Sequence, residues 1–238
     1  MKNMLSIIVS TKDEEEPISH VIEDIEKIEL DNFEILVVDK STDGTREQVR
    51  RLMKKYDNLR LIEQENNGKG NAMKLGVEKT KGNKICFLDG DCTYPAKYIP
   101  RMVELLKDHD IVIGSRLILK ENANQTFETM YYYRIAPILT NFIFGKFKTS
   151  EPMSGMRVMR KETWNRLNIK SKGFTVETEM EIKMAKLGFH VAEIPVPCIP
   201  RKGNSKFNWS WKDMLRIIRL VRNNSRYLDN LTVDVYLE

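Results

Sequence analysis

The chain is poor in cysteine. Only three of its 238 residues are cysteines, and they stand at positions 86, 92 and 198. An odd number at these spacings fits neither a disulfide framework nor a zinc knuckle, so we interpret them as reduced thiols. The first ten residues run directly into a strand-like segment without a basic start or a small-residue cleavage site, so no secretory signal is expected. These absences predict a cytoplasmic protein.

Two glycine-rich fingerprints of nucleotide-binding folds are also absent. Residues 10–16, which follow the first strand-like run, contain no Gly-x-Gly-x-x-Gly. The segment 68–72, Gly-Lys-Gly-Asn-Ala, lacks the Gly-Lys-Ser/Thr ending of a P-loop. Any nucleotide must therefore be bound in another way.

The composition is that of a soluble globular enzyme. Apolar residues make up 41% of the chain and charged residues 31%. The length suits one large α/β domain, or at most two small ones. The net charge of +5 is unevenly placed, with Lys and Arg crowding the last third, which predicts an anionic surface as partner. We expect no nucleic-acid partner.

Strand-like and helix-like runs alternate in the first half, which is typical of βαβ units and a mostly parallel sheet. Beyond residue 114 the alternation breaks, and we expect helices over 127–147 and 174–187 and a last strand. The expected strands are 5–9, 33–38, 59–62, 85–88, 111–114 and 190–196. The expected helices of the first half are 16–28, 45–56 and one that follows a glycine-rich turn within 66–79.

The sequence Asp89-Gly90-Asp91 directly follows the apolar run 85–88. Open α/β sheets hold their ligands at the carboxyl ends of their strands, and carboxylate oxygens there suit Mg²⁺ or Mn²⁺ shared with substrate phosphates. An ordinary turn after a strand is the alternative.

Other residues at expected strand ends could serve the same ligand. Asp39 is placed to bind base and ribose, although it could simply cap a turn. Lys69, with the backbone of Gly68 and Gly70, could approach a diphosphate, although an Asn-Asn-Gly turn opening a helix explains them equally well.

Taken in order, these segments resemble the successive motifs of family 2 glycosyltransferases, and most closely the dolichol-phosphate mannose synthase branch. The resemblance covers residues 5 to about 207. It rests on Thr11-Lys12-Asp13-Glu14, Val37-Val38-Asp39 with 41–45, Gly68 to Ala72 with Gly76, Asp89-Gly90-Asp91, 113–116 and Ser154-Gly155-Met156-Arg157.

The resemblance implies a GT-A fold, a nucleotide-sugar donor, an Asp-x-Asp metal site and transfer with inversion. It places the metal at Asp89 and Asp91, with Thr93 as a further ligand candidate. The implied donor-binding residues are Thr11, Asp13, Glu14, Asp39, Gly68, Lys69, Gly70, Asp89 and Gly90. Ser10, Lys12, Asp13 and Lys40 depart from the family pattern, which leaves sugar and base open.

The acceptor is argued from charge. A phosphate monoester is already anionic at neutral pH and attacks without a general base, so its site needs cations, and arginine binds phosphate bidentately. The candidates on or near the motifs are Arg116, Arg134, Ser154, Arg157, Arg201, Ser205 and Lys206. The segment 201–206 looks like the mobile basic loop of this branch, although a solvated basic loop is the alternative.

Glu177 and Glu179 match acidic residues that face the active site in the family. With a hydroxyl acceptor, one of them would act as base. With a phosphate acceptor, they would hold the metal shell, the donor sugar or a cationic loop residue. As helix-surface acids they would have no function.

Two segments suit a membrane interface. Residues 127–147 are aromatic and amphipathic, but Glu128 and Arg134 interrupt them, and a bilayer span needs roughly 20 apolar residues. Residues 209–238 begin with a second basic amphipathic helix, which we separate from a catalytic domain over 1–208. Packing of both helices on the core is the alternative.

We therefore expect a peripheral enzyme on the cytoplasmic face of the membrane. It would use Mg²⁺ or Mn²⁺ to move a hexose from GDP-mannose, UDP-glucose or UDP-GlcNAc to a polyprenyl (dolichyl-type) phosphate. A membrane-anchored partner subunit or a homo-oligomer is possible. The alternatives are a transferase of the same fold that acts on a saccharide hydroxyl, and a non-catalytic subunit that binds nucleotide sugar or lipid phosphate.

Overall fold

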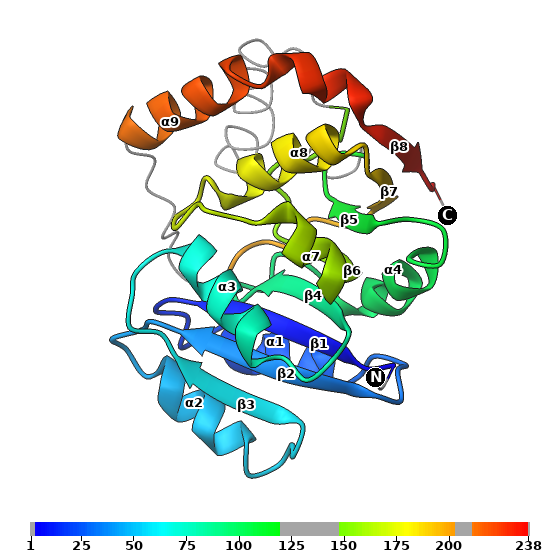
Figure 1. Ribbon diagram of the computed structural model, residues 1–238. Coiled ribbons are helices and arrows are strands. Elements are labelled where there is room, and N and C mark those ends of the chain that lie inside the picture. The colour runs from blue at the N-terminus through cyan, green and yellow to red at the C-terminus, as the bar shows by residue number, and fades with distance from the viewer. Residues whose placement is uncertain (1–2, 120–147, 203–210, 238) are drawn as a thin grey trace.

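The computed structural model describes residues 3–119, 148–202 and 211–237 (Figure 1). Its first half alternates strands and helices. These are β1 (Leu5–Thr11), α1 (Ile18–Ile25), β2 (Phe33–Asp39), α2 (Thr45–Leu52), β3 (Leu59–Glu63), α3 (Lys69–Lys79), β4 (Lys84–Asp89), the 3₁₀ turn η1 (Ala96–Tyr98), α4 (Ile99–Leu105) and β5 (Ile111–Ser115).

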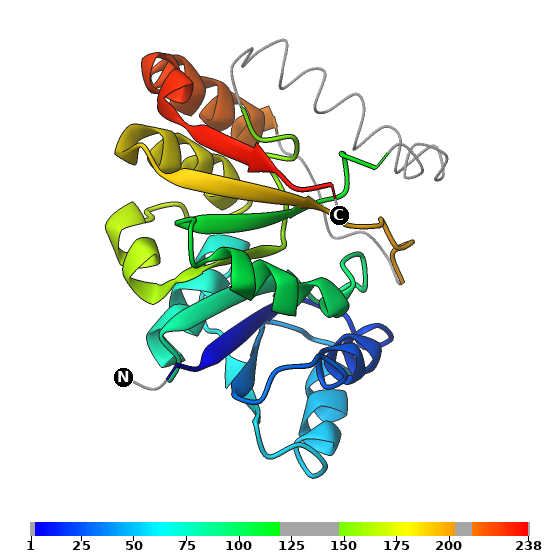
Figure 2. The ribbon, with the colours of Figure 1, turned by 90° about the vertical axis from the view of Figure 1, so that its right-hand side faces the viewer.

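The second half is more varied. It contains β6 (Arg157–Arg160), α7 (Lys161–Leu167), α8 (Val176–Leu187), β7 (His190–Pro195), α9 (Trp211–Arg222), the 3₁₀ turn η4 (Ser225–Asn230) and β8 (Thr232–Val235). The strands form one sheet in the order β3-β2-β1-β4-β6-β5-β7-β8. Figure 2 shows this sheet from its N-terminal strands at the bottom to β8 at the top.

The sheet is parallel except at β6, which runs antiparallel to both β4 and β5. The carboxyl ends of all the other strands therefore meet at one edge. In the register of β1 and β4, Ser10 lies opposite Asp89, and in that of β1 and β2, Thr11 lies opposite Asp39. This edge gathers the motif residues that follow each strand.

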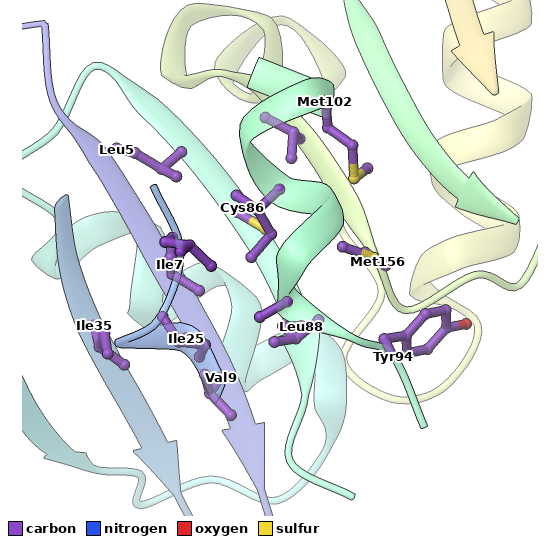
Figure 3. Packing of buried hydrophobic residues seen from close by; sticks show 14 of the residues in the cluster. Leu5, Ile7, Val9, Ile25, Ile35, Cys86, Leu88, Tyr94, Met102 and Met156 are labelled. Carbon is purple, nitrogen blue, oxygen red and sulfur yellow. The ribbon is translucent and has the colours of Figure 1, made fainter. Parts of the chain in front are cut away.

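The core has two layers, one on each face of the sheet. Leu5, Ile7 and Val9 alternate along β1 and point to the face covered by α1 and α4 (Figure 3). Ile8 points to the opposite face, which packs against α3, α7 and α8. Alternate apolar positions on a strand that is covered on both faces produce the near-continuous apolar runs seen in the sequence.

All the expected strands are present, with ends shifted by one or two residues. The glycine-rich turn and following helix expected within 66–79 are confirmed, with the helix at Lys69–Lys79, whereas the helix expected over 16–28 is shortened to 18–25. Sequence reasoning missed α4, β6, α7 and β8. The segment 127–147 lies outside the described residues.

Candidate active site

The two aspartates lie at the carboxyl end of β4, as predicted. Asp89 is the last residue of the strand, and Asp91 follows within a tight turn in which Cys92 takes a left-handed backbone conformation (φ 66°). Two glycines are needed for this packing. A Cβ on Gly90 would lie 2.6 Å from the Thr11 methyl group, and one on Gly155 would lie 2.1 Å from Asp89 Oδ2. The Ser154–Met156 turn therefore lies directly against the Asp89 carboxylate.

Lys69 connects Asp89 to helix α8. Its Nζ lies 2.7 Å from Asp89 Oδ1 and 2.7 Å from Glu177 Oε1. Burial alone would lower the pKa of the Lys69 ammonium, but the negative charges of Asp89 and Glu177 outweigh it and hold that pKa above its usual value. Lys69 is therefore a fixed positive charge beside the acidic pair.

Glu177 keeps one oxygen unused. Its side chain is 4% exposed, and within the described part of the chain its buried Oε2 has no hydrogen-bond partner. An unsatisfied buried carboxylate oxygen is costly, and such atoms are typical of sites that a ligand completes. Glu177 thus offers an acceptor next to Asp89.

Asp91 is held by residues from two other segments. Arg201, after β7, places one guanidinium nitrogen 2.5 Å from Asp91 Oδ2 and hydrogen bonds Glu14 with the other. The Arg201 Nε is buried and has no partner among the residues described. The backbone amide of Lys202 lies 3.4 Å from the Asp91 carbonyl oxygen, which ties this loop to the acidic turn.

Thr93, the further metal-ligand candidate, contacts the Asp91 carboxylate. Its backbone N–H and its hydroxyl both donate to Asp91 Oδ1, at 3.1 and 2.7 Å. The side chain is buried. In this arrangement Thr93 orients the Asp91 carboxylate and leaves Oδ2 to face Arg201, so we do not assign it as a metal ligand.

The first motif is locked to the turn after β2. Thr11 donates to Asp39 Oδ1 at 2.8 Å, and Asp13, whose φ is 52°, accepts from the Thr42 amide at 2.7 Å. The hydroxyl of Thr45 accepts from the Glu14 amide at 2.9 Å. The residues of these two segments that we expected to bind the nucleotide-sugar donor therefore lie together at the carboxyl ends of β1 and β2.

Arg46 was not predicted to belong to this group. Its Nε lies 2.7 Å from Asp39 Oδ2, and this hydrogen bond raises the pKa of the guanidinium. Asp39 is fully buried, and Ser41 also donates to both of its oxygens. A basic residue seven positions after an aspartate carries no periodic signal that would have revealed the pair.

Gly68 and Gly70 are used for packing against another loop. Gly68 has φ 110°, and a Cβ there would lie 2.3 Å from the Lys172 carbonyl oxygen. A Cβ on Gly70 would lie 2.5 Å from that of Ser171. The close backbone approach inferred from sequence is real, but its partner here is the 171–173 loop, and contact with a diphosphate stays a prediction.

Glu179 does not share the position of Glu177. Its two oxygens accept from the backbone amides of Lys170 and Ser171, at 2.6 to 3.1 Å, and pair with Lys183 at 2.7 Å. Burial would raise the Glu179 pKa, but these donors lower it overall. Residues two apart on a helix face different sides. Glu179 therefore supports the 170–173 loop, and we omit it from the proposed catalytic groups.

Arg116 is joined to a glutamate that sequence reasoning did not single out. Its backbone amide and guanidinium both donate to Glu151, at 2.5 to 3.0 Å. The guanidinium lies over the Tyr94 ring at 4.0 Å, and the Tyr94 hydroxyl accepts from the Gly155 amide at 2.9 Å. Arg116 is thus anchored beside the turn that contacts Asp89.

Two predicted phosphate ligands lie in the core instead. Arg157 is fully buried and donates to Glu181 at 2.8 Å and to the carbonyl oxygens of Ser154 and Pro152. Ser154 is also fully buried and donates to the Gly114 carbonyl oxygen at 2.6 Å. We leave both out of the acceptor site. Arg134, Ser205 and Lys206 lie outside the described residues.

The architecture is that of an α/β protein of the GT-A type, with two aspartates at the carboxyl end of β4. Residues 6–167 match the sequence profile described as "Glycosyl transferase family 2", so the chain belongs to that family and is a glycosyltransferase. Its fold is also that of a glucosyl-3-phosphoglycerate synthase from Mycobacterium tuberculosis, crystallised with Mn²⁺ and UDP-glucose. The two agree with TM-score 0.65 and 17% identity, over 96% of this chain and 80% of the other.

Two archaeal relatives carry dolichyl or dolichol phosphate in their names. The "Dolichyl-phosphate hexose transferase" of Haloferax volcanii is 29% identical over 205 residues, 86% of each chain. The "Dolichol-phosphate mannosyltransferase" of Pyrococcus furiosus is 28% identical over 184 residues, which are 75% of this chain and 52% of the relative. The chain thus spans most of the first relative and about half of the second.

No helix in the described ranges is long and apolar enough to cross a bilayer. Helix α9 buries Ile217 and Val221 against the domain, while Leu215 is 53% exposed between basic residues of the same helix. The helix is therefore packed on the core along one side, and it also presents an apolar side chain to solvent.

Proposed function

We propose that this glycosyltransferase moves a hexose from a nucleotide-sugar donor to a polyprenyl (dolichyl-type) phosphate, with Mg²⁺ or Mn²⁺ and with inversion. The observation that carries the proposal is the pairing of each aspartate with a cation from a distant segment. Asp89 contacts Lys69, and Asp91 contacts Arg201. Alternating negative and positive groups at a strand end suit a metal ion and a diphosphate.

The donor set fits a divalent ion. Asp91 Oδ2 and the Asp89 carboxylate are hard oxygen ligands, which a bound ion would take over from, or share with, Arg201 and Lys69. Bound there, the ion would stabilise the negative charge on the departing nucleoside diphosphate. Lys69, which contacts Asp89, would neutralise the charge of a diphosphate oxygen. Thr93 would hold Asp91 in its orientation.

The acceptor follows from the balance of bases and cations. A phosphate oxygen attacks the anomeric carbon as its carbon–oxygen bond to the diphosphate breaks, and no proton has to be removed from the nucleophile. Arg201, whose buried Nε has no partner within residues 3–119, 148–202 and 211–237, and the anchored Arg116 are the described candidates to orient that phosphate. The names of the two archaeal relatives support a lipid phosphate. Glu177 Oε2 would accept from a donor-sugar hydroxyl.

The activity test uses purified protein, Mg²⁺ or Mn²⁺, a short polyprenyl phosphate and a panel of GDP-mannose, UDP-glucose and UDP-GlcNAc. One donor should give a lipid-linked monosaccharide, and Asp91→Asn should abolish it while the exposed-site control Asp31→Asn does not. The acceptor assignment is wrong if the sugar goes to a saccharide hydroxyl and never to the lipid phosphate. Tight donor binding without any turnover would indicate a non-catalytic binding subunit.

A second function is favoured by one observation. The unused Glu177 oxygen lies near Asp89 and could serve as base for a saccharide hydroxyl. That enzyme would lose activity as a carboxylate becomes protonated, whereas transfer to a phosphate would instead depend on Arg116 and Arg134.

The membrane surface is the proposed location of the acceptor. Leu215 with the neighbouring basic residues of α9 suits a peripheral contact with anionic lipid on the cytoplasmic face, alone or with a membrane-anchored partner subunit. Sedimentation with anionic vesicles should fall for Leu215→Glu and stay unchanged for neutral vesicles. Equal sedimentation of both proteins would exclude this contact.

A further inference from the structure

Two of the three histidines in the chain meet at the edge of the sheet opposite the candidate active site. His109 directly precedes the β5 region and His190 begins β7, so both lie near the amino ends of parallel strands. Asp234 of β8 completes the group, and one ligand atom from each residue lies within 4.8 Å of the others. In Figure 2, β7 and β8 run side by side in the same direction.

The hydrogen bonding of His109 fixes its tautomer. Its Nδ1 lies 2.9 Å from the carbonyl oxygen of Leu105, and a carbonyl oxygen can only accept, so Nδ1 carries the hydrogen. A neutral ring then has a lone pair at Nε2. That nitrogen lies 3.1 Å from Asp234 Oδ2, which is also an acceptor. Two acceptors at this distance need a shared positive charge, which is either a proton on His109 Nε2 or a bound cation.

His190 approaches the same oxygen. Its Nε2 lies 2.8 Å from Asp234 Oδ2, and the rings of His109 and His190 are 4.4 Å apart. The hydroxyl of Tyr236 is 3.5 Å from His109 Nε2, at the outer limit of a hydrogen bond. Two imidazole nitrogens and a carboxylate oxygen thus converge on one small volume.

We propose that His109, His190 and Asp234 bind a transition-metal ion of the Zn²⁺ class. Imidazole with carboxylate is a donor set that zinc accepts, and zinc ligands at about 2.0–2.2 Å from the metal stand roughly 3.3 Å apart, close to the observed spacing. A histidine that binds metal through one nitrogen commonly donates its other N–H to a backbone carbonyl, as His109 does to Leu105.

The site has a buried side and an open side. The His109 side chain is 1% exposed, whereas those of His190 and Asp234 are 41% and 46% exposed. An ion can therefore enter from solvent, and water can fill its remaining position. Since the ligands come from the segment before β5, from β7 and from β8, the ion would fasten the outermost strand to the sheet.

The test is calorimetric titration of the chelator-stripped full chain with Zn²⁺, followed by titration with Co²⁺ and its visible absorption spectrum. We expect one tight Zn²⁺ per chain, a tetrahedral Co²⁺ spectrum and a raised melting temperature. His190→Gln and Asp234→Asn should each weaken binding by more than the roughly 10- to 100-fold that follows loss of a residue that only orients a ligand.

Two controls separate this site from the others. His20→Gln removes the remaining exposed histidine and should leave Zn²⁺ binding unchanged. Asp91→Asn should also retain the tight Zn²⁺, because it alters the opposite edge of the sheet. The proposal is overturned if Zn²⁺ does not bind, if His190→Gln binds it as well as the parent, or if Asp91→Asn alone abolishes binding.

Discussion

Two buried ion-pair groups lie close to each other in this enzyme and differ in how fully their polar atoms are used. The site group consists of Lys69, Asp89 and Glu177. The core group consists of Arg157 and Glu181, which are 0% exposed. In the core group both Glu181 oxygens are bonded, one to Arg157 and the other to Thr149.

The site group leaves bonding capacity open. Glu177 Oε2 is buried without a partner in the described part of the chain, and so is Nε of the nearby Arg201. An ion pair whose polar atoms are all bonded supports the fold, whereas buried atoms without a partner beside the acidic turn are candidates to bind a ligand. This difference separates the arginine that supports the fold from the charged groups that we propose to bind substrate.

The largest stability effect is expected in the core group. Arg157→Met leaves the buried Glu181 carboxylate without its cation and should cost about 3–5 kcal/mol of unfolding free energy. Urea denaturation measures it. The double variant Arg157→Met with Glu181→Leu removes both charges and should recover much of that loss. A single variant as stable as the parent would contradict the assignment of Arg157 to the core.

A pH dependence of stability is expected from Glu193, a buried acid near the core group. Burial raises the pKa of Glu193 to about 7, and the charge of the nearby Glu181 adds to the rise. The ordinary value in the unfolded chain is 4.5. Between these values the folded state binds more protons, so stability is greatest below pH 4.5 for this group and falls as pH rises to 7.

That fall is on the order of 3 kcal/mol at most. Unfolding free energies measured by urea at several pH values should show it in the parent, on top of the titration of other groups. Glu193→Gln should remove this component and be more stable than the parent above pH 7. Identical pH slopes in the two proteins would show that Glu193 keeps an ordinary pKa.

Two glutamates of α8, Glu177 in the site group and Glu179 beside the 170–173 loop, can be compared through the same substitution. Glu177→Gln should lower turnover by about 100-fold through misplacement of bound groups, with little change in stability. Glu179→Gln should lose about 1–3 kcal/mol of stability, because it weakens charged hydrogen bonds to the 170–171 amides, and should keep turnover per folded molecule. A loss of stability in Glu177→Gln together with a loss of turnover in Glu179→Gln would contradict these two assignments.

Most of the fold was predictable because β1 to β4 bury both faces and alternate with amphipathic helices. Strand β6 was missed because it has four residues, begins and ends with arginine, and runs against the parallel direction. The positions of Asp39, Asp89 and Asp91 at the strand ends were predictable because these acids follow apolar strands. That Arg157 and Ser154 point inward was not, since a motif gives positions along the chain but not the direction of side chains.

Contacts between residues far apart in the sequence could not be predicted either. Glu151 binds Arg116, and Arg201 contacts Asp91 and Glu14, which lie 110 and 187 residues before it. No local pattern records such pairs. Lys40 departs from the family pattern, so the sequence does not identify the nucleotide base. The structure does not identify it either, because Thr11, Ser41 and Arg46 already bond both oxygens of Asp39.

The most direct test of the central claim is calorimetric binding of GDP and UDP, with and without Mg²⁺ or Mn²⁺, to the parent and to Asp91→Asn. If Asp89 and Asp91 hold the metal and diphosphate, one nucleotide should bind the parent tightly only with metal, and Asp91→Asn should lose that metal-dependent gain. Equal affinity and equal metal dependence in the two proteins would contradict it.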